Sequence, residues 1–127
     1  MKILTVDIGT GTQDIFLYDS RLDIENGFKL VLPSPTMMIH RRLKQALPTR
    51  TPILLTGHQM GGGPSAWAIE ECARAGVPVY MTPSAATTIN DELEKVEALG
   101  IRIVSEEESK KLKVKGKPTR AASAYLR

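Results

Sequence analysis

The segment Asp7–Thr12 (DIGTGT) has the residue types of a phosphate-binding turn. Its glycines would let an oxyanion approach the backbone, and its threonines could donate hydroxyl hydrogen bonds. A carboxylate just before such a turn could hold a hydrated Mg²⁺, and Asp7 is therefore the predicted metal ligand, acting through water. The predicted phosphate or nucleotide contacts here are Asp7, Gly9, Thr10, Gly11, Thr12 and Gln13. The alternative is a tight turn that Asp7 merely caps.

A second glycine-rich segment, Thr56–Pro64 (TGHQMGGGP), precedes an apolar helical pattern. A loop that enters a helix N-terminus offers free N–H groups and the positive end of the helix dipole to an anion. His58, with an ordinary pKa near 6.5, could carry a proton or bind phosphate. The predicted contacts here are Gly57, His58, Gly61, Gly62 and Gly63. The alternative is that the glycines only allow close packing and that His58 is solvated.

The elements around these segments indicate an α/β fold with the order βββαβαβαβ. The expected strands are residues 3–7, 14–20, 28–32, 53–56, 77–81 and 101–104, and the first three should form an antiparallel meander. Expected helices run from Ser34-Pro35 to Pro48, from Pro64 to Gly76, and through Ile89–Leu99 behind a Thr88 cap. Strand–helix alternation predicts that strands one, four, five and six are parallel in one mixed sheet sandwiched by helices. Both glycine segments would then lie side by side.

The chain divides by charge. Its net charge is +3, yet residues 110–127 contain seven Lys or Arg and no acid. We therefore expect one domain over residues 1–109 and a basic extension over 110–127 that begins with a short edge strand at Leu112 and Val114. The basic charge is confined to this extension, which makes nucleic acid an unexpected partner.

Composition restricts location and cofactors. No apolar run is long enough for a bilayer span, and Asp7 interrupts the N-terminal segment where a signal peptide would be apolar, so we expect a cytoplasmic protein without a membrane partner. The single cysteine, Cys72, cannot form an internal disulfide or hold an iron–sulfur cluster. It is expected to be a buried, inert thiol.

Several separated motifs carry a family resemblance: MKILTVDIGTGTQDIFLYD, KLVLPSPT, LLTGHQMGGGP and VPVYMTPSAATTIND. The turn and the element order resemble the ribonuclease H-like half of the actin, sugar-kinase and heat-shock-chaperone ATPase superfamily. Together the motifs look like an uncharacterised family of archaea and anaerobes labelled "putative pyruvate formate-lyase-activating enzyme", over about residues 1–108. The resemblance implies ATP or another nucleotide with Mg²⁺, and a second lobe that completes the nucleotide cleft.

These observations favour a nucleotide- or phosphate-binding domain, with a nucleotide or a phosphorylated small molecule as partner. Radical activating-enzyme chemistry is not expected with one cysteine, and ATP hydrolysis is not expected of a single lobe. A non-catalytic interaction module, such as a homodimer, is the alternative. The turn also resembles that of the small Holliday-junction resolvases, but no acid follows strands four and five to complete a nuclease metal site.

Overall fold

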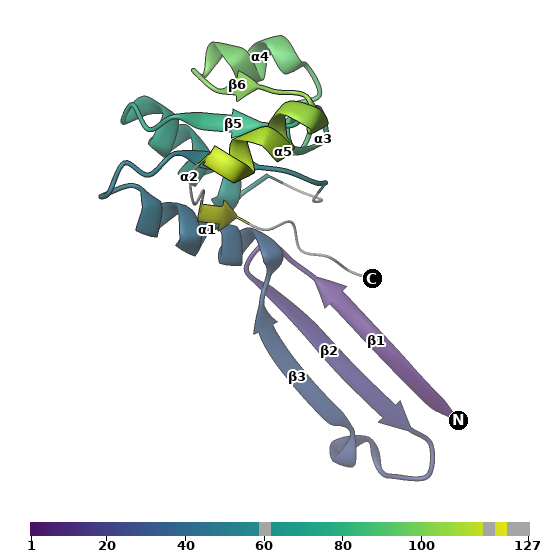
Figure 1. The fold of residues 1–127 in the computed structure, drawn as a ribbon. Helices are drawn as coiled ribbons and strands as arrows, with labels where there is room; N and C mark the ends of the chain where they lie inside the picture. Colours follow the sequence, from purple (N-terminus) through teal and green to yellow (C-terminus); the bar gives the residue numbers. More distant parts are fainter. Residues whose placement is uncertain (59–61, 116–118, 122–127) are drawn as a thin grey trace.

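A computed structural model of the chain describes residues 1–58, 62–115 and 119–121. It is an α/β structure with two separate sheets (Figure 1). Residues 1–33 form a three-stranded sheet that extends away from the rest of the molecule, and we call this part the arm. The remaining described residues form the body, which contains a four-stranded sheet and all the α-helices.

The arm is an antiparallel meander, as the sequence predicted. Strand β1 (Lys2–Ile8) pairs with β2 (Thr12–Asp19), which pairs with β3 (Phe28–Pro33), and a 3₁₀ turn, η1 (Ile24–Asn26), lies between β2 and β3. The register places Val6 opposite Ile15, and Ile15 opposite Leu30. Side chains of directly paired residues point to the same face, so this register assigns each paired strand residue of the arm to one of two faces.

The body alternates helices with short parallel strands. Along the chain its elements are α1 (Pro35–Ala46), β4 (Ile53–Leu55), α2 (Pro64–Arg74), β5 (Val79–Met81), α3 (Pro83–Ala86), α4 (Leu93–Ala98), β6 (Arg102–Ile103), α5 (Glu106–Lys115) and β7 (Thr119–Ala121). The strand order is β6-β5-β4-β7, and every pairing in this sheet is parallel.

The hydrophobic core formed by the residues whose burial is described lies in the body. Its most buried members include Leu43 from α1, Ile53 from β4, Met81 from β5 and Val96 from α4, each with at most 1% of its surface exposed. Cys72 on α2 belongs to the same cluster, as the sequence predicted. Burial raises the pKa of the Cys72 thiol, with a smaller effect from the neighbouring Glu71 carboxylate, which keeps the thiol protonated and inert.

Local sequence signals place most helix ends correctly. Ser34 is the N-cap of α1, its side chain accepting a hydrogen bond from the Met37 N–H, and Pro35 is the first helical residue. Pro64 opens α2, and Gly76 follows its end with a φ of 76°. Each of these signals acts over a few residues, so the fold of distant segments does not alter it.

The predicted single mixed sheet is wrong. Among the described residues, strand β1 pairs with β2 alone, and the position beside β4 is taken by β7, which lies within the basic segment 110–127. Periodicity identifies strands but does not choose their neighbours, and strand β7 competes for the same edge of β4 that β1 was expected to occupy.

Two predicted elements after β5 also differ. The expected helix over Ile89–Leu99 is divided into α3 and α4, and α4 begins only at Leu93 because Asn90 accepts the Glu92 N–H in a turn. The expected edge strand at Leu112 is instead part of α5, whose start is a capping box between Ser105 and Glu108. Helix α5 spans residues 109 and 110, and the division into a domain and an extension there stays a prediction.

Candidate functional site

The first glycine segment forms the turn between β1 and β2. The Gly9 N–H donates to the Thr12 carbonyl across 2.9 Å and closes the hairpin. A Cβ added to Gly11 would meet no heavy atom within 4 Å, so the backbone there faces open space. The turn therefore has room for a ligand against Gly11, whereas the Gly9 amide is already used.

Two buried hydroxyl groups anchor this turn to the body. Ser34 Oγ and Thr36 Oγ1 each lie 2.7 Å from the Thr10 carbonyl oxygen and 2.9 Å from each other. Both residues are buried, with 0% of the surface of Ser34 and 4% of the surface of Thr36 exposed. The Ser34 N–H also donates to the Gly11 carbonyl. The sequence indicated Ser34 only as a helix cap, because nothing local revealed that Thr10 would share the same hydroxyl.

The second glycine segment comes next to this turn. Gly63, with a φ of 55°, is the N-cap of α2, and a Cβ built on it would lie 3.7 Å from Thr10 Cγ2. Ser65 Oγ donates to the Gly62 carbonyl, and the Trp67 N–H donates to the Gly63 carbonyl. We call the turn Gly9–Thr12 together with the α2 start, Gly62–Ser65, the junction site.

The two segments were predicted to be adjacent, and they are, but for a different reason. The prediction relied on neighbouring strands β1 and β4, which do not pair. Instead helix α1, whose start anchors the turn, packs along α2. His40 adds a direct link, since its Nδ1 lies 3.0 Å from the Pro64 carbonyl oxygen. A carbonyl oxygen can only accept, so this nitrogen carries a proton, and His40 makes a structural contact between the two helices.

Residues of the second segment also line a small pocket. Gly57 and His58 line it together with Ser65 and Thr88, and Ile39 and Met81 contribute apolar walls. It offers about 30 Å³ to a water-sized molecule. Ligand pockets for drug-sized molecules occupy roughly 300–1,000 Å³, so this pocket can take a water molecule but not a nucleotide. Gly61 lies outside the described residues.

Thr88 lines this pocket and is not the helix N-cap that the sequence predicted. Its hydroxyl donates to the Ala85 carbonyl across 2.6 Å, and the Thr87 hydroxyl donates to the Ser84 carbonyl. Both threonines therefore end α3 rather than begin α4. The hydroxyl of Thr88 is half-buried beside Gly62, whose added Cβ would lie 3.7 Å from the Thr88 carbonyl oxygen.

Asp7 lies on β1 directly opposite Asp14 on β2. Both line a shallow groove on one face of the arm, with Glu25 and Lys29 among the other lining residues, and Thr12 Oγ1 donates to Asp14 across 3.1 Å. Within residues 1–58, 62–115 and 119–121, no three His, Cys, Asp or Glu side chains form a group that could hold a metal. Two facing carboxylates can still share a hydrated cation, because water supplies most ligands of Mg²⁺ in such sites.

Gln13 makes a hydrogen bond within the arm. Its side-chain amide donates to the Pro33 carbonyl across 3.1 Å, which joins β2 to the end of β3. The register also places Gln13 on the opposite face of the arm from Asp7 and Asp14. The predicted contacts are thus divided: Thr10 and Gly63 meet at the junction site, Gly57 and His58 line the small pocket, and Asp7 faces the groove.

A protein-family model matches the chain. The family model described as "Putative pyruvate format-lyase activating enzyme (DUF1786)" covers residues 60–123. The chain belongs to this family. Searches of curated proteins and of solved structures return no match. The matched residues include helix α2 and strands β5, β6 and β7. The arm and the turn Gly9–Thr12 lie before the first matched residue.

The chemistry in the family's label does not fit this chain. A radical activating enzyme needs three cysteine thiolates for its [4Fe–4S] cluster, and the sequence contains one cysteine. That cysteine is buried in the core, and its pKa is raised by burial. No step of a radical reaction can therefore be assigned to residues of this family member.

The described part of this family member contains no helix long and apolar enough to cross a bilayer.

Proposed function

We propose that this chain binds the phosphate of a nucleotide or of another phosphorylated small molecule at the junction site. The observation that carries the proposal is the closeness of Thr10 and Gly63: a Cβ built on Gly63 would lie 3.7 Å from Thr10 Cγ2, which places a glycine turn beside the start of an 11-residue helix. The N-terminus of α2 attracts an anion through its dipole and its first N–H groups. The open space at Gly11 leaves room for that anion to approach the turn.

The size of the neighbouring pocket sets the form of this binding. With about 30 Å³ available, the pocket beside His58 does not accept an adenosine group. The phosphate would bind at the junction site while the rest of the ligand extends outward, where a second lobe could cover it. This arrangement agrees with the resemblance to one half of an actin-like ATPase, and the ribonuclease H-like assignment of the fold is part of the same proposal.

In this proposal Asp7 holds Mg²⁺ through water, with Asp14 opposite it as the second carboxylate. The facing pair is otherwise unfavourable, because like charges directly opposite each other on antiparallel strands repel. A divalent cation between them would relieve the repulsion. Binding of Mg²⁺ should therefore depend on both carboxylates if the cation sits between the strands, and on Asp7 alone if it sits toward the turn.

The test is an NMR titration of the whole chain with inorganic phosphate, ADP and ATP, each with and without Mg²⁺. We expect shifts in the amides of Gly9–Thr12 and of Gly62–Trp67. The variant Gly11→Ala should retain the stability of the wild type, since its Cβ meets nothing, yet weaken binding by blocking the approach to the backbone. Asp7→Asn and Asp14→Asn form a matched pair for the Mg²⁺-dependent part.

If the amide signals of both segments do not shift at millimolar phosphate and nucleotide, the proposal is wrong. Equal binding of all three ligands would indicate a phosphate site without recognition of the base. Undiminished binding by Gly11→Ala would move the ligand away from the turn.

A further inference from the structure

The two faces of the arm differ sharply in character. The register puts Leu4, Val6 and Ile8 of β1 on the same face as Ile15 and Leu17 of β2 and Phe28, Leu30 and Leu32 of β3. We call this set face A. Gln13 is the one polar side chain among its three central rows, and Lys2 and Asp19 begin the next row, at the end far from the body.

The opposite face is more polar and is partly covered. It carries Thr5, Asp7 and Asp14, and the Phe16 ring packs over Gly27, where an added Cβ would lie only 2.3 Å from it. The turn η1 also overhangs this side, since Ile24 and Glu25 line the groove there. The half-buried Phe16 ring and the turn η1 thus cover part of this face with residues of the same chain.

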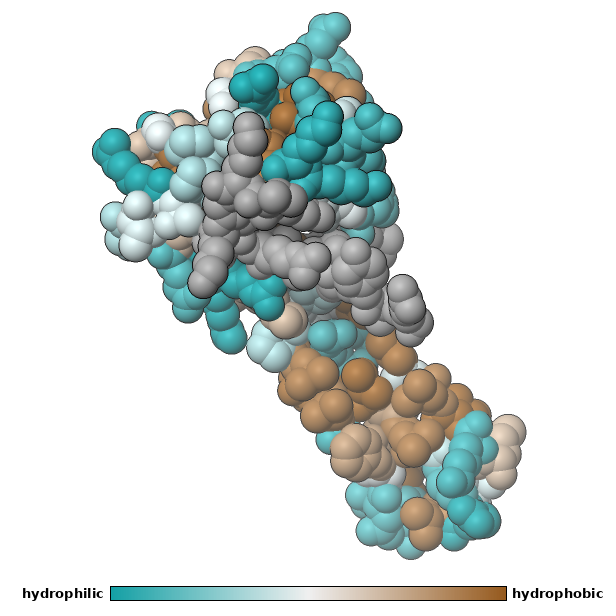
Figure 2. All heavy atoms as spheres, in the orientation of Figure 1, coloured by the Kyte–Doolittle hydropathy of each residue, from teal (hydrophilic) through white to brown (hydrophobic). Residues whose placement is uncertain are grey.

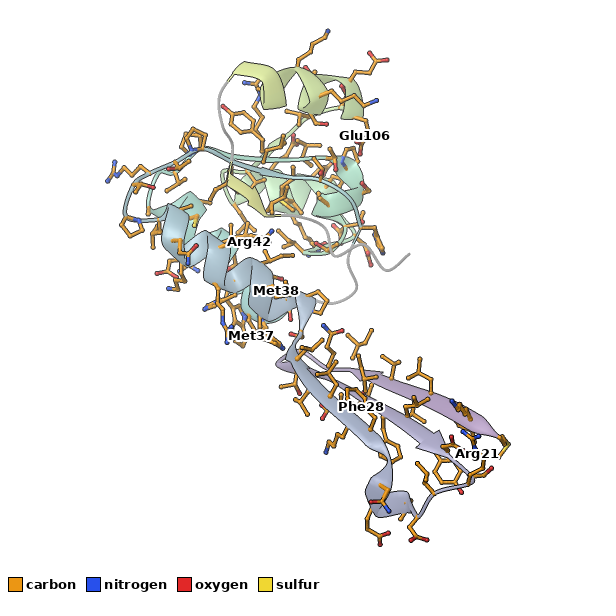
Figure 3. The ribbon with its side chains drawn as sticks, turned by 60° about the horizontal axis from the view of Figure 1, so that its bottom comes forward. Arg21, Phe28, Met37, Met38, Arg42 and Glu106 are labelled. Atoms are coloured by element: carbon orange, nitrogen blue, oxygen red, sulfur yellow. The ribbon has the colours of Figure 1, made fainter. Side chains whose placement is uncertain are left out.

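Nothing in the described part of the chain covers face A in this way. Leu4 is 62% exposed, Val6 51% and Phe28 61%. On the side seen in Figure 2, hydrophobic residues gather on the part of the arm nearer the body, in contrast to the mostly hydrophilic surface of the body, and Figure 3 shows Phe28 on the arm, away from the helices of the body. A sheet face as largely apolar as this one is normally packed against another layer.

We propose that two copies of this chain associate through face A, forming a two-fold symmetric β-sandwich from their two arms. This inference does not depend on phosphate binding at the junction site. A second copy of face A is the partner that fits best, because the central rows of face A carry no charge that would complement a charged partner protein. A contact between two identical faces is isologous and closes as a dimer. The polar end formed by Lys2, Asp19 and Arg21 would be the rim.

The area of face A is sufficient for a weak dimer. Three strands spaced about 4.8 Å apart and six to seven residues long at about 3.3 Å each give a flat footprint of roughly 300 Å². Side-chain relief raises the accessible area to roughly 500–600 Å² per copy, so a dimer buries about 1,000–1,200 Å², the lower limit for a specific interface. The body joins the arm at one end only, so antiparallel stacking of the two arms keeps the bodies apart (Figure 1).

The experiment is sedimentation velocity of the full chain from low micromolar to near-millimolar concentration. Two variants place a lysine on face A, Val6→Lys on one edge strand and Leu30→Lys on the other. The matched control is Val31→Lys, which lies next to Leu30 on β3 but on the opposite face, paired with Asp14. Val31 is 50% exposed, like Val6, so the control has the same chemistry and burial. Circular dichroism verifies that each variant is folded.

We expect a concentration-dependent dimer for the wild type and for Val31→Lys, and at least a tenfold weaker association for both face A variants. A wild type that stays monomeric throughout overturns the proposal. So does an equal loss in Val31→Lys, or no loss in either face A variant. Loss in only one of the two would indicate pairing along one strand edge and would overturn the face-to-face arrangement.

Discussion

One of the links between the arm and the body is the Thr10 carbonyl oxygen with its two hydroxyl partners, and this arrangement predicts that the two hydroxyls are energetically coupled. Ser34 Oγ and Thr36 Oγ1 both lie 2.7 Å from the Thr10 carbonyl, and their two protons serve three contacts. Removal of either hydroxyl leaves the other free to donate to Thr10. Removal of both hydroxyls leaves the Thr10 carbonyl without its side-chain donors. The loss in free energy of unfolding for the double variant should therefore exceed the sum of the losses for the two single variants.

The magnitudes follow from the contacts. Ser34→Ala loses the cap on the Met37 N–H, worth about 1 kcal/mol, and part of a hydrogen bond worth about 0.5–1.5 kcal/mol. Thr36→Val loses only the second contribution. The double variant also pays for an unsatisfied carbonyl, about 1–3 kcal/mol, so we expect a coupling of at least 1 kcal/mol in the free energy of unfolding.

The assay is urea unfolding of the wild type, both single variants and the double variant, followed by circular dichroism. Thr49 and Thr51 provide the control cycle, because their hydroxyls lie 2.6 Å apart and Thr49 donates to the Ala46 carbonyl in a more exposed place. Water can replace those contacts, and the control should be additive. Additivity within about 0.5 kcal/mol for Ser34 and Thr36 would refute the shared-carbonyl reasoning.

Three further predictions concern the body. Leu43→Ala removes a side chain that is 1% exposed and should cost about 2–5 kcal/mol in urea unfolding; a loss below about 1 kcal/mol would place Leu43 outside the core. Hydrogen bonds with Ser105 hold the pKa of Glu108 below its ordinary value. These bonds therefore contribute fully to the stability of the fold when the pH is above the pKa of Glu108 in the unfolded chain, and the contribution is lost as the pH falls through its pKa in the folded chain. The melting temperature of Glu108→Gln should therefore trail the wild type at neutral pH and converge with it in acid, whereas a constant difference would contradict the capping box. Cys72 should react with a thiol reagent only as fast as the body opens, and immediate labelling of the folded chain would disprove its burial.

The candidate site was only partly within reach of the sequence. Both glycine segments were recognised from composition, and their adjacency was expected, although the expected reason was wrong. The hydroxyl pair of Ser34 and Thr36 was missed, because a residue 24 positions from Thr10 gives no local sign of contact. The role of His40 was missed for the same reason, since its partner is a backbone carbonyl on another helix.

Short-range physics made much of this fold readable from the amino-acid order alone. The antiparallel meander, the cap at Ser34, the helix start at Pro64 and the burial of Cys72 depend on neighbours within a few residues or on simple hydropathy. The choice of strand neighbours depends on competition across the whole chain, and only the tertiary structure shows β7 beside β4 and the arm as a separate sheet. Hydropathy could not reveal that face A is bare, because the same alternation of apolar residues suits a strand buried within its own chain and one left for a partner.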